Sequence, residues 1–184
     1  MSPFPLAGVL APILGSGQSL DETIWADFDT TTAGWEDEVG NTTNLHDSVN
    51  SENDSLYVIL SSWILNTTER IVFGLEDPSG EPTPNQSVEV FVRAEYLENF
   101  EVLPTAPTMT IRFDENGTQR ATSSALSLTK SPADYSFFLN TTQINSVTDW
   151  NDVEMDILFD NTANTGVDEE AKFQIYEVRT IFTP

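Results

Sequence analysis

Alternating apolar and polar side chains recur along this sequence and limit it to β-structure. Apolar residues occupy every second position from Val88 to Tyr96, and charged residues such as Glu89 and Arg93 fill most of the positions between them. Because successive side chains of a strand point to opposite faces of a sheet, this period of two predicts a strand with one face on a core.

A hairpin and several further strands follow from the same kind of pattern. Segment 109–114 alternates and is followed by Asn116 and Gly117, which predicts a hairpin with segment 118–122. In segment 171–182 the apolar register slips around Tyr176, which predicts a β-bulge or a strand buried on both faces. The remaining expected strands are 23–29, 56–65, 70–76, 135–139 and 153–159. Roughly eight or nine short strands at this spacing predict an all-β fold, a two-sheet antiparallel sandwich like a jelly roll.

The first residues of the chain predict an extended apolar arm with a Gly/Ser hinge. Prolines interrupt residues 1–18, and no Lys or Arg precedes the apolar residues, so the segment differs from a signal peptide that it otherwise resembles. Apolar side chains on an irregular arm need a surface that buries them, and a neighbouring subunit provides one. The residues expected to bind this partner are Phe4, Leu6, Val9, Leu10, Ile13 and Leu14. We therefore expect an arm over residues 1–20 and a β-sandwich domain over residues 21–184.

The charge of the chain excludes several classes of partner. The sequence has 30 Asp and Glu against 7 Lys and Arg, a formal net charge of -23. A surface of that sign repels phosphate, so we expect no binding of nucleic acid or of anionic membranes, and no apolar run is long enough for a membrane span. Two interpretations of the acidity remain: adaptation to molar salt, which screens the repulsion between carboxylates, or an acidic secreted or marine protein at ordinary salt.

Catalytic motifs are scarce in the sequence, which predicts a protein that is not an enzyme. The chain has no Cys and a single His, His46, and it lacks a Gly-x-Ser-x-Gly elbow and a glycine-rich phosphate loop. Asp152, Glu154 and Asp156 share one face of a predicted strand, a spacing compatible with a glycosidase pair. The same spacing is typical of an acidic solvent-facing strand, and the apolar residues between these acids favour that interpretation.

A loop rich in acids is a candidate calcium site, and no other cofactor is expected. Asp47, Glu52 and Asp54 crowd segment 41–55, and hard cations bind oxygen ligands of this kind. The spacing does not match an EF-hand, and a solvated acidic loop is the alternative interpretation.

Several short segments resemble a pattern in proteins of tailed viruses. The pattern begins with GWEDEVG at 34–40 and continues with LHDSV at 45–49 and NDSLYV at 53–58. In the viral pattern, a Trp, a short loop and an acidic residue precede Asp-x-x-Tyr-Ile. The likeness continues at 73–78, 88–94, 144–155 and 172–182.

This resemblance implies a jelly-roll virion structural protein, a capsid decoration, a turret or a tail component on the particle exterior. It would form a homo-oligomer, a trimer or a pentamer on a symmetric site, and it would contact capsid or tail proteins. The acidity of the chain fits a virus of a halophilic archaeal host. The alternative is a carbohydrate-binding module, secreted or at a cell surface, that recognises host surface glycans; Trp35 and Trp63 are its candidate contacts, although each Trp also fits a sandwich core.

Overall fold

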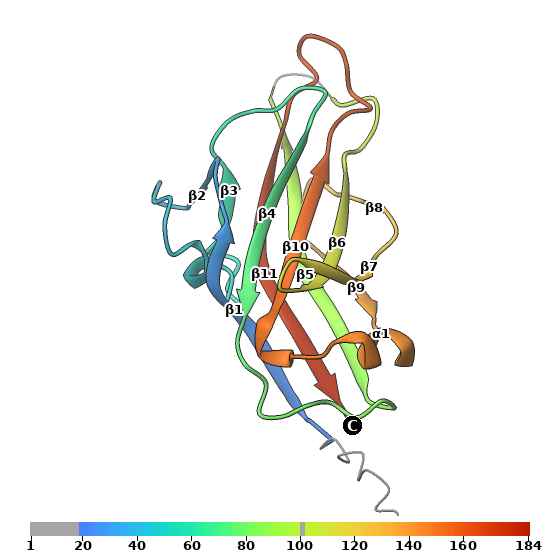
Figure 1. The fold of residues 1–184 in the computed structure, drawn as a ribbon. Helices are drawn as coiled ribbons and strands as arrows, with labels where there is room; N and C mark the ends of the chain where they lie inside the picture. The colour runs from blue at the N-terminus through green and yellow to red at the C-terminus, as the bar shows by residue number, and fades with distance from the viewer. Residues whose placement is uncertain (1–18, 100–101) are drawn as a thin grey trace, which may run out of the picture.

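A computed structural model describes residues 19–99 and 102–184, and Figure 1 shows their arrangement. The strands are β1 (Glu22–Thr31), β2 (Trp35–Asp37), β3 (Val58–Leu60), β4 (Thr68–Leu75), β5 (Ser87–Glu98), β6 (Thr108–Glu115), β7 (Thr118–Thr122), β8 (Leu126–Ser127), β9 (Ala133–Phe138), β10 (Val153–Asp160) and β11 (Ala171–Thr183). One short α-helix, α1 (Thr141–Ser146), and two 3₁₀ turns, η1 (Leu45–Ser48) and η2 (Trp150–Asp152), complete the described elements. None of the helices in these residues is long and apolar enough to cross a membrane.

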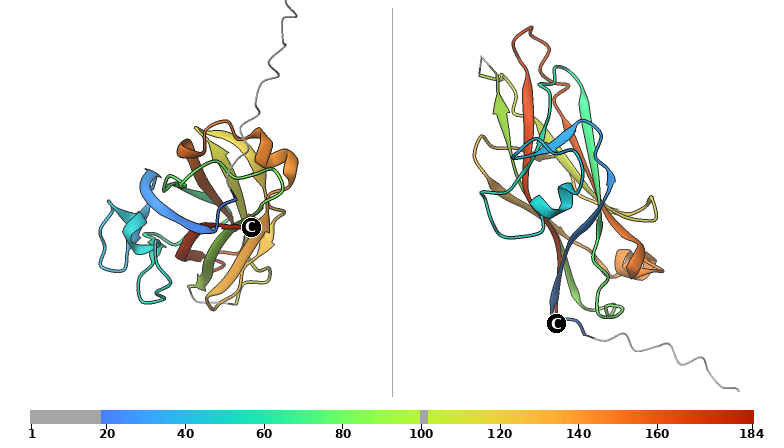
Figure 2. Two further views of the ribbon diagram at one scale, coloured as in Figure 1. Left: turned by 90° about the horizontal axis from the view of Figure 1, so that it is seen from below. Right: turned by 90° about the vertical axis from the view of Figure 1, so that its left-hand side faces the viewer.

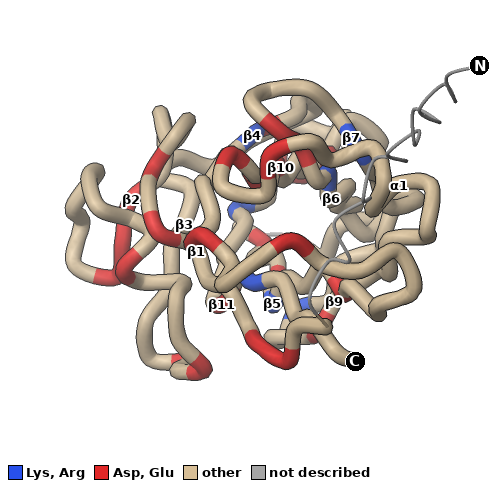
Figure 3. The backbone as a smooth tube through the Cα atoms, turned by 60° about the horizontal axis from the view of Figure 1, so that its bottom comes forward, with Lys and Arg blue, Asp and Glu red and all other residues tan. Residues whose placement is uncertain are grey.

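The strands form two antiparallel layers, which confirms the predicted sandwich. In the first layer, here the β5 sheet, the order is β1-β11-β5-β9, and in the second, the β10 sheet, it is β4-β10-β6-β7. Figure 3 shows the two layers facing each other. Strands β4, β5 and β6 alternate between the layers, and so do β9, β10 and β11, whereas β6, β7 and β8 lie in one layer. Such alternation is typical of a jelly roll.

Strand β1 joins the two layers at one side of the sandwich. Residues 22–25 pair with β11, and from Ala26 onward the strand pairs with β4 instead. On the N-terminal side of Arg179, the same edge of β11 pairs with β3 through Gln174 and Ile175. The β2–β3 segment adds a small extension that protrudes from the side of the sandwich (Figure 2).

Aromatic side chains from both layers fill the core. Trp35, Phe73, Phe113, Phe159, Phe173 and Phe182 are all fully buried. The rings of Phe159 and Phe173 stack with centroids 4.5 Å apart, and Trp35 lies 5.5 Å from Phe159. Burying a side chain of this size contributes about 2 to 3 kcal/mol to folding, so these contacts hold the layers together.

The structure confirms the predicted hairpin and the predicted bulge. Asn116 and Gly117 have φ values of 47° and 71°, the left-handed pair that a tight hairpin turn between β6 and β7 requires. The register of β11 against β5 shifts between Ile175 and Glu177, so Tyr176 is the bulged residue. After the bulge, Val178 and later alternate residues return to the core.

One predicted strand is shorter than expected, and one prediction lies outside the described residues. Segment 56–65 forms only β3 and an isolated bridge at Ile64, because Ser61 turns the chain by donating from its N–H and its hydroxyl to the Gly34 carbonyl. The six arm residues from Phe4 to Leu14 precede residue 19, so the structure does not describe them. Leu20 is already buried in the core, one residue before the predicted domain boundary.

Candidate functional site

The outer face of the β5 sheet carries a hollow of about 500 Å³, bounded on one side by the loop that precedes β3. Outward-facing residues of β5, β9 and β11 form its floor. The loop places acidic and amide side chains along its rim. The lining residues are Glu52, Asn53, Asp54, Ser55, Phe91, Arg93, Asp134, Glu177 and Arg179.

Arg93 on β5 connects the loop to β9. Its Nε and Nη2 donate to the two carboxylate oxygens of Asp54 at 2.8 and 2.9 Å, and its Nη1 donates to Asp134. This fork fixes the orientation of the guanidinium group as well as its position. Hydrogen bonding from Arg93 lowers the pKa of Asp54, so this carboxylate stays ionised and accepts hydrogen bonds.

Arg179 on β11 occupies the other half of the hollow. Its guanidinium group lies 4.4 Å from the centroid of the Phe91 ring and 5.2 Å from that of Trp25. Its Nη1 contacts Glu52 of the loop and lies 2.7 Å from Glu177 Oε1. Only 15% of the Arg179 side chain is exposed, so the aromatic rings and the two acids hold it in one orientation.

Glu177 is the buried acid of the hollow. The residue is 4% exposed, and burial raises the pKa of its carboxyl, while the charge of Arg179 lowers it. Its Oε1 has no hydrogen bond of acceptable geometry, although Arg179 is close. Buried carboxylates normally satisfy their acceptors, and for this oxygen the nearby charge of Arg179 provides the compensation.

The hollow presents hydrogen-bond donors and acceptors in fixed positions, and its acids outnumber its arginines. Four carboxylates and two guanidinium groups line it, an excess of two negative charges. This excess repels anionic ligands, and the polar lining offers little to an apolar one. A hydroxyl group both donates and accepts, so alternating guanidinium and carboxylate groups match a ligand that carries several hydroxyls.

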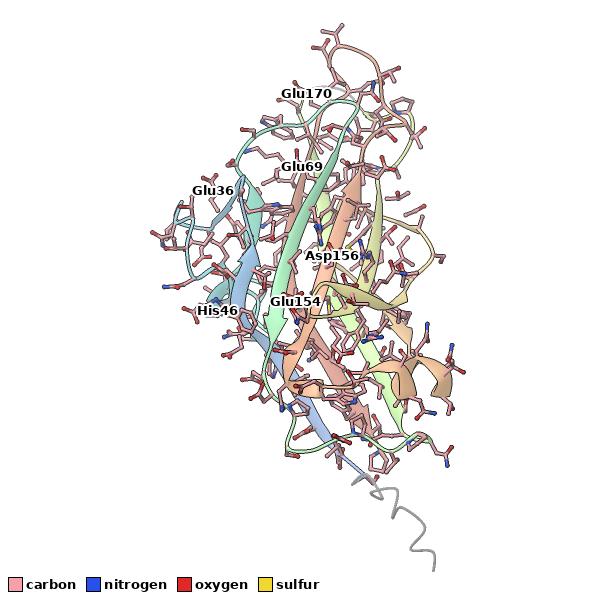
Figure 4. The ribbon with its side chains drawn as sticks, viewed as in Figure 1. Glu36, His46, Glu69, Glu154, Asp156 and Glu170 are labelled. Atoms are coloured by element: carbon pink, nitrogen blue, oxygen red, sulfur yellow. The ribbon has the colours of Figure 1, made fainter. Side chains whose placement is uncertain are left out.

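A second charged cluster lies on the outer face of the β10 sheet, here the β10 cluster. Asp156, labelled with Glu154 in Figure 4, lies between Arg70 Nε at 2.7 Å and Arg112 Nη1 at 3.0 Å. Arg112 Nη2 also donates to Asp114 at 3.1 Å. Asp114 and Asp156 are each 1% exposed, and burial raises the pKa of Asp114. The two arginines therefore cover the acids from solvent.

This cluster corrects the expectation that the acids of β10 face water. Val153, Met155, Ile157 and Phe159 point into the core as predicted. Asp156 is nevertheless buried, because arginines from β4 and β6 pair with it across the sheet. An acid sealed under two guanidinium groups has no access to a sugar, so the arrangement is not that of a glycosidase pair.

The predicted calcium site is wrong for the described residues. Glu52 contacts Arg179, and Asp54 contacts Arg93, whereas Asp47 lies in η1 with its carboxylate 3.6 Å from His46 Nε2. No group of three or more His, Asp or Glu in residues 19–99 and 102–184 is placed to hold a metal ion. Arg179 and Arg93 therefore pair with Glu52 and Asp54, which were expected to bind a calcium ion.

The predicted glycan contacts also change. Trp35 is fully buried, and its Nε1 donates to the Arg70 carbonyl at 3.1 Å, so it is a core residue and cannot contact a glycan. Trp63 is half-buried with Lys172 Nζ 5.5 Å from its ring centroid, and it does not line the hollow. His46 is held by Asp29 Oδ1, 3.0 Å from its Nδ1.

Most of the residues that build the hollow could not be predicted from the sequence. Glu52 and Asp54 were predicted only as metal ligands, and no role was predicted for Arg93, Asp134, Glu177 or Arg179. The alternation of β5 does place Arg93 on the outer face. Which outward residues become neighbours depends on strand order, and no local pattern encodes that order.

The protein is a β-sandwich like a jelly roll, with a polar surface hollow in which Arg93 and Arg179 hold the acidic side chains in place. Neither a protein-family model nor a curated protein matches the sequence. Among solved structures, the chain is similar to one described as "CBM4 structure and function", with a TM-score of 0.40 and 13% identity over 82% of this chain and 95% of that chain. The sandwich itself is established by the strand pairing.

Proposed function

We propose that this protein is a non-catalytic module that binds glycans in the hollow on the β5 sheet. The observation that carries the proposal is the ring of guanidinium and carboxylate groups held in fixed directions around about 500 Å³. Preorganised polar groups bind a ligand without losing side-chain entropy on binding, which favours recognition of a sugar by its hydroxyls.

The charge of the hollow defines the class of glycan. Its surplus of carboxylates opposes sialylated, sulfated and uronic-acid glycans. Neutral sugars have hydroxyls for both kinds of group, and an amino sugar would add a cation for the exposed carboxylates of Glu52 and Asp54. We therefore expect neutral or amino-substituted glycans as ligands.

Binding without hydrolysis is supported by the way the acids are held. Arg179 bridges Glu52 and Glu177, and Arg93 bridges Asp54 and Asp134. A general acid must reach the leaving oxygen with its proton, and the guanidinium group lies between Glu177 and such a ligand. The raised pKa of Glu177 therefore reflects burial under an arginine and not an exposed proton donor.

A glycan array with the full chain in about 1 M NaCl, where charges beyond about 3 Å are screened, tests the proposal. We expect retention on neutral or amino-substituted glycans and release of no reducing sugar. Glu52→Gln and Asp54→Asn should each weaken binding about tenfold, the loss of one good hydrogen bond to a charged group. Glu154→Gln, the matched change on the opposite sheet, should leave binding unchanged. Binding to no glycan, or equal losses in all three variants, would refute the proposal.

The second candidate function is that of a virion structural protein on the particle exterior, which the resemblance of segments 34–58 to tailed-virus proteins suggests. A specific observation favours it: β9 is a sheet edge that no described strand covers. Such an edge can pair with a neighbouring subunit. The two candidates are compatible, because a particle-surface protein can bind host glycans.

The virion role is tested by imaging particles that lack this protein. We expect the loss of a defined exterior density, and a variant without residues 2–18 should fold but fail to join the particle. Normal particles, or normal incorporation of the truncated chain, would contradict this role.

A further inference from the structure

Strand β9 is the longest free sheet edge in the described part of the chain. It pairs with β5 on one side, and no described strand pairs with its other side. Figure 3 shows it at the end of its layer. The other edges are blunted: β2 has three residues, two of them acidic, and β7 pairs with β6 through a register shift. Such features normally prevent sheets from adding strands. Strand β9 has six residues, only one of them acidic, and it pairs with β5 without a register shift.

The unpaired backbone groups of β9 can be identified. Leu139 N–H donates to the Val88 carbonyl at 2.9 Å, so this residue pair faces β5. Backbone direction alternates along an antiparallel ladder, and the N–H and C=O groups of Asp134, Ser136 and Phe138 therefore face outward. The side chains of these three residues lie on the outer face of the β5 sheet, where Asp134 lines the hollow and Phe138 is 62% exposed.

The charge along β9 identifies a second copy of this chain as its partner. A net charge of -23 opposes close approach of two copies over most of their surface. The one charged residue of β9 is Asp134, and Arg93 Nη1 contacts it. This edge is thus a place where two copies can meet with little repulsion, and main-chain hydrogen bonds supply the attraction.

We propose that β9 strands of two copies pair antiparallel, centred on Ser136, and join two β5 sheets into one. Centring on Asp134 would place two carboxylates opposite each other, and centring on Phe138 would shorten the overlap. With Ser136 at the centre, Phe138 of the second copy lies opposite Asp134, with Cβ atoms about 5 Å apart. The resulting dimer differs from the trimer or pentamer expected from the viral resemblance.

The pairing completes the hollow as a glycan site, a part of the inference that rests on the proposed function. The hollow's own aromatic ring, Phe91, lies under Arg179 and offers no free face. Phe138 of the second copy would place an exposed ring at the rim beside Asp134. The two hollows open on the same face of the joined sheet, and their central strands, β5 of each copy, are three strand spacings apart, about 14 Å. A glycan that spans them would bind with avidity.

Light scattering and sedimentation of the full chain in about 1 M NaCl test the pairing without any glycan. We expect a dimer that dissociates on dilution. Ser136→Pro removes an outward N–H and should raise the dimer dissociation constant more than tenfold, whereas Ser136→Ala keeps that N–H and should match the native chain. A native chain that stays monomeric at its highest soluble concentration, or two Ser136 variants with equal dissociation constants, would overturn the proposal.

A second pair of variants tests the register and leaves the backbone intact. Phe138→Glu places a carboxylate opposite Asp134 of the second copy and should abolish the dimer, while Phe138→Gln should keep it but bind glycans at least tenfold more weakly. Dimers of both Phe138 variants would refute the register. A native dimer that binds no glycan would refute the glycan function and leave the pairing standing.

Discussion

The outer faces of the two sheets use the same kinds of residue in opposite ways. In the β10 cluster the acids are sealed, with Asp114 and Asp156 1% exposed, and the arginines lie over them. In the hollow the arginines are the covered partners and the acids are exposed: Arg179 is 15% exposed, while 72% of the Glu52 side chain is in contact with solvent. Glu177 is the exception, an acid buried with its arginine.

This inversion distinguishes the structural network of the β10 cluster from the binding site that we propose in the hollow. Buried carboxylates need their arginines, because ionised groups without partners are costly in a region of low dielectric constant. Exposed carboxylates held by anchored arginines can exchange water for a ligand's hydroxyls at little cost to the fold. The same residue types therefore stabilise one face of the sandwich, and in the proposed function they offer ligand contacts on the other.

The largest expected difference between the two faces is in folding stability. Arg112→Met leaves Asp114 buried without its hydrogen-bond donor and should cost about 3 kcal/mol. Arg93→Met leaves Asp54 and Asp134, both more than half exposed, free to rehydrate and should cost about 1 kcal/mol or less. Urea denaturation at fixed salt measures both. Equal costs would remove the distinction, and the double variant Arg112→Met with Asp114→Asn should recover part of the loss.

Asp114 and Asp54, one on each face, should also respond to acid with opposite signs. Burial raises the pKa of Asp114 above 3.8, so its contribution to stability falls as the pH rises from 3.8 through the folded-state pKa. The hydrogen bond from Arg93 lowers the pKa of Asp54 below 3.8, so its contribution is present above pH 3.8 and is lost as the pH falls through the folded-state pKa.

Differences in unfolding free energy between the native chain and each Asn variant isolate these two carboxyls from the other acids. For Asp114→Asn the native-minus-variant difference should decrease with rising pH, and for Asp54→Asn it should increase. The same sign for both would show that the two acids have similar environments.

The smallest expected effect concerns the turn of the β6–β7 hairpin, at the edge of the β10 sheet. Gly117 has a φ of 71° and donates its N–H to Glu154 Oε2 at 3.1 Å. A Cβ there meets no atom within 4 Å, so Gly117→Ala should cost only the backbone strain, about 1 kcal/mol. Gly80→Ala, where the backbone does not need a left-handed φ, is the control and should be nearly neutral. Thermal melts of the two variants that coincide would contradict this reason for the glycine.

Local pattern was enough to predict most of the fold. The alternation in β5, the Asn116–Gly117 turn and the register slip at Tyr176 are each visible in a short stretch of sequence, although the bulge forms against the distant strand β5. Segment 56–65 was predicted too long because its turn at Ser61 depends on the distant Gly34 carbonyl.

The two outer faces could not be predicted in the same way. The burial of Asp156 depends on Arg70 and Arg112, which are far from it in the sequence and adjacent only through strand order. The hollow likewise joins Asp54, Arg93 and Arg179 from three separate segments. In an acid-rich chain many loops offer carboxylates, so the informative residues were the few arginines and their partners.

The central claim, that the hollow binds ligand and the β10 cluster does not, is tested most directly by NMR of the arginine Nε–Hε groups during titration with a neutral or amino-substituted oligosaccharide. The account predicts saturable shifts of the Arg93 and Arg179 signals, while those of Arg70 and Arg112 stay in place. Shifts of Arg70 and Arg112 with the hollow unaffected, or no shift with any glycan of the panel, would contradict it.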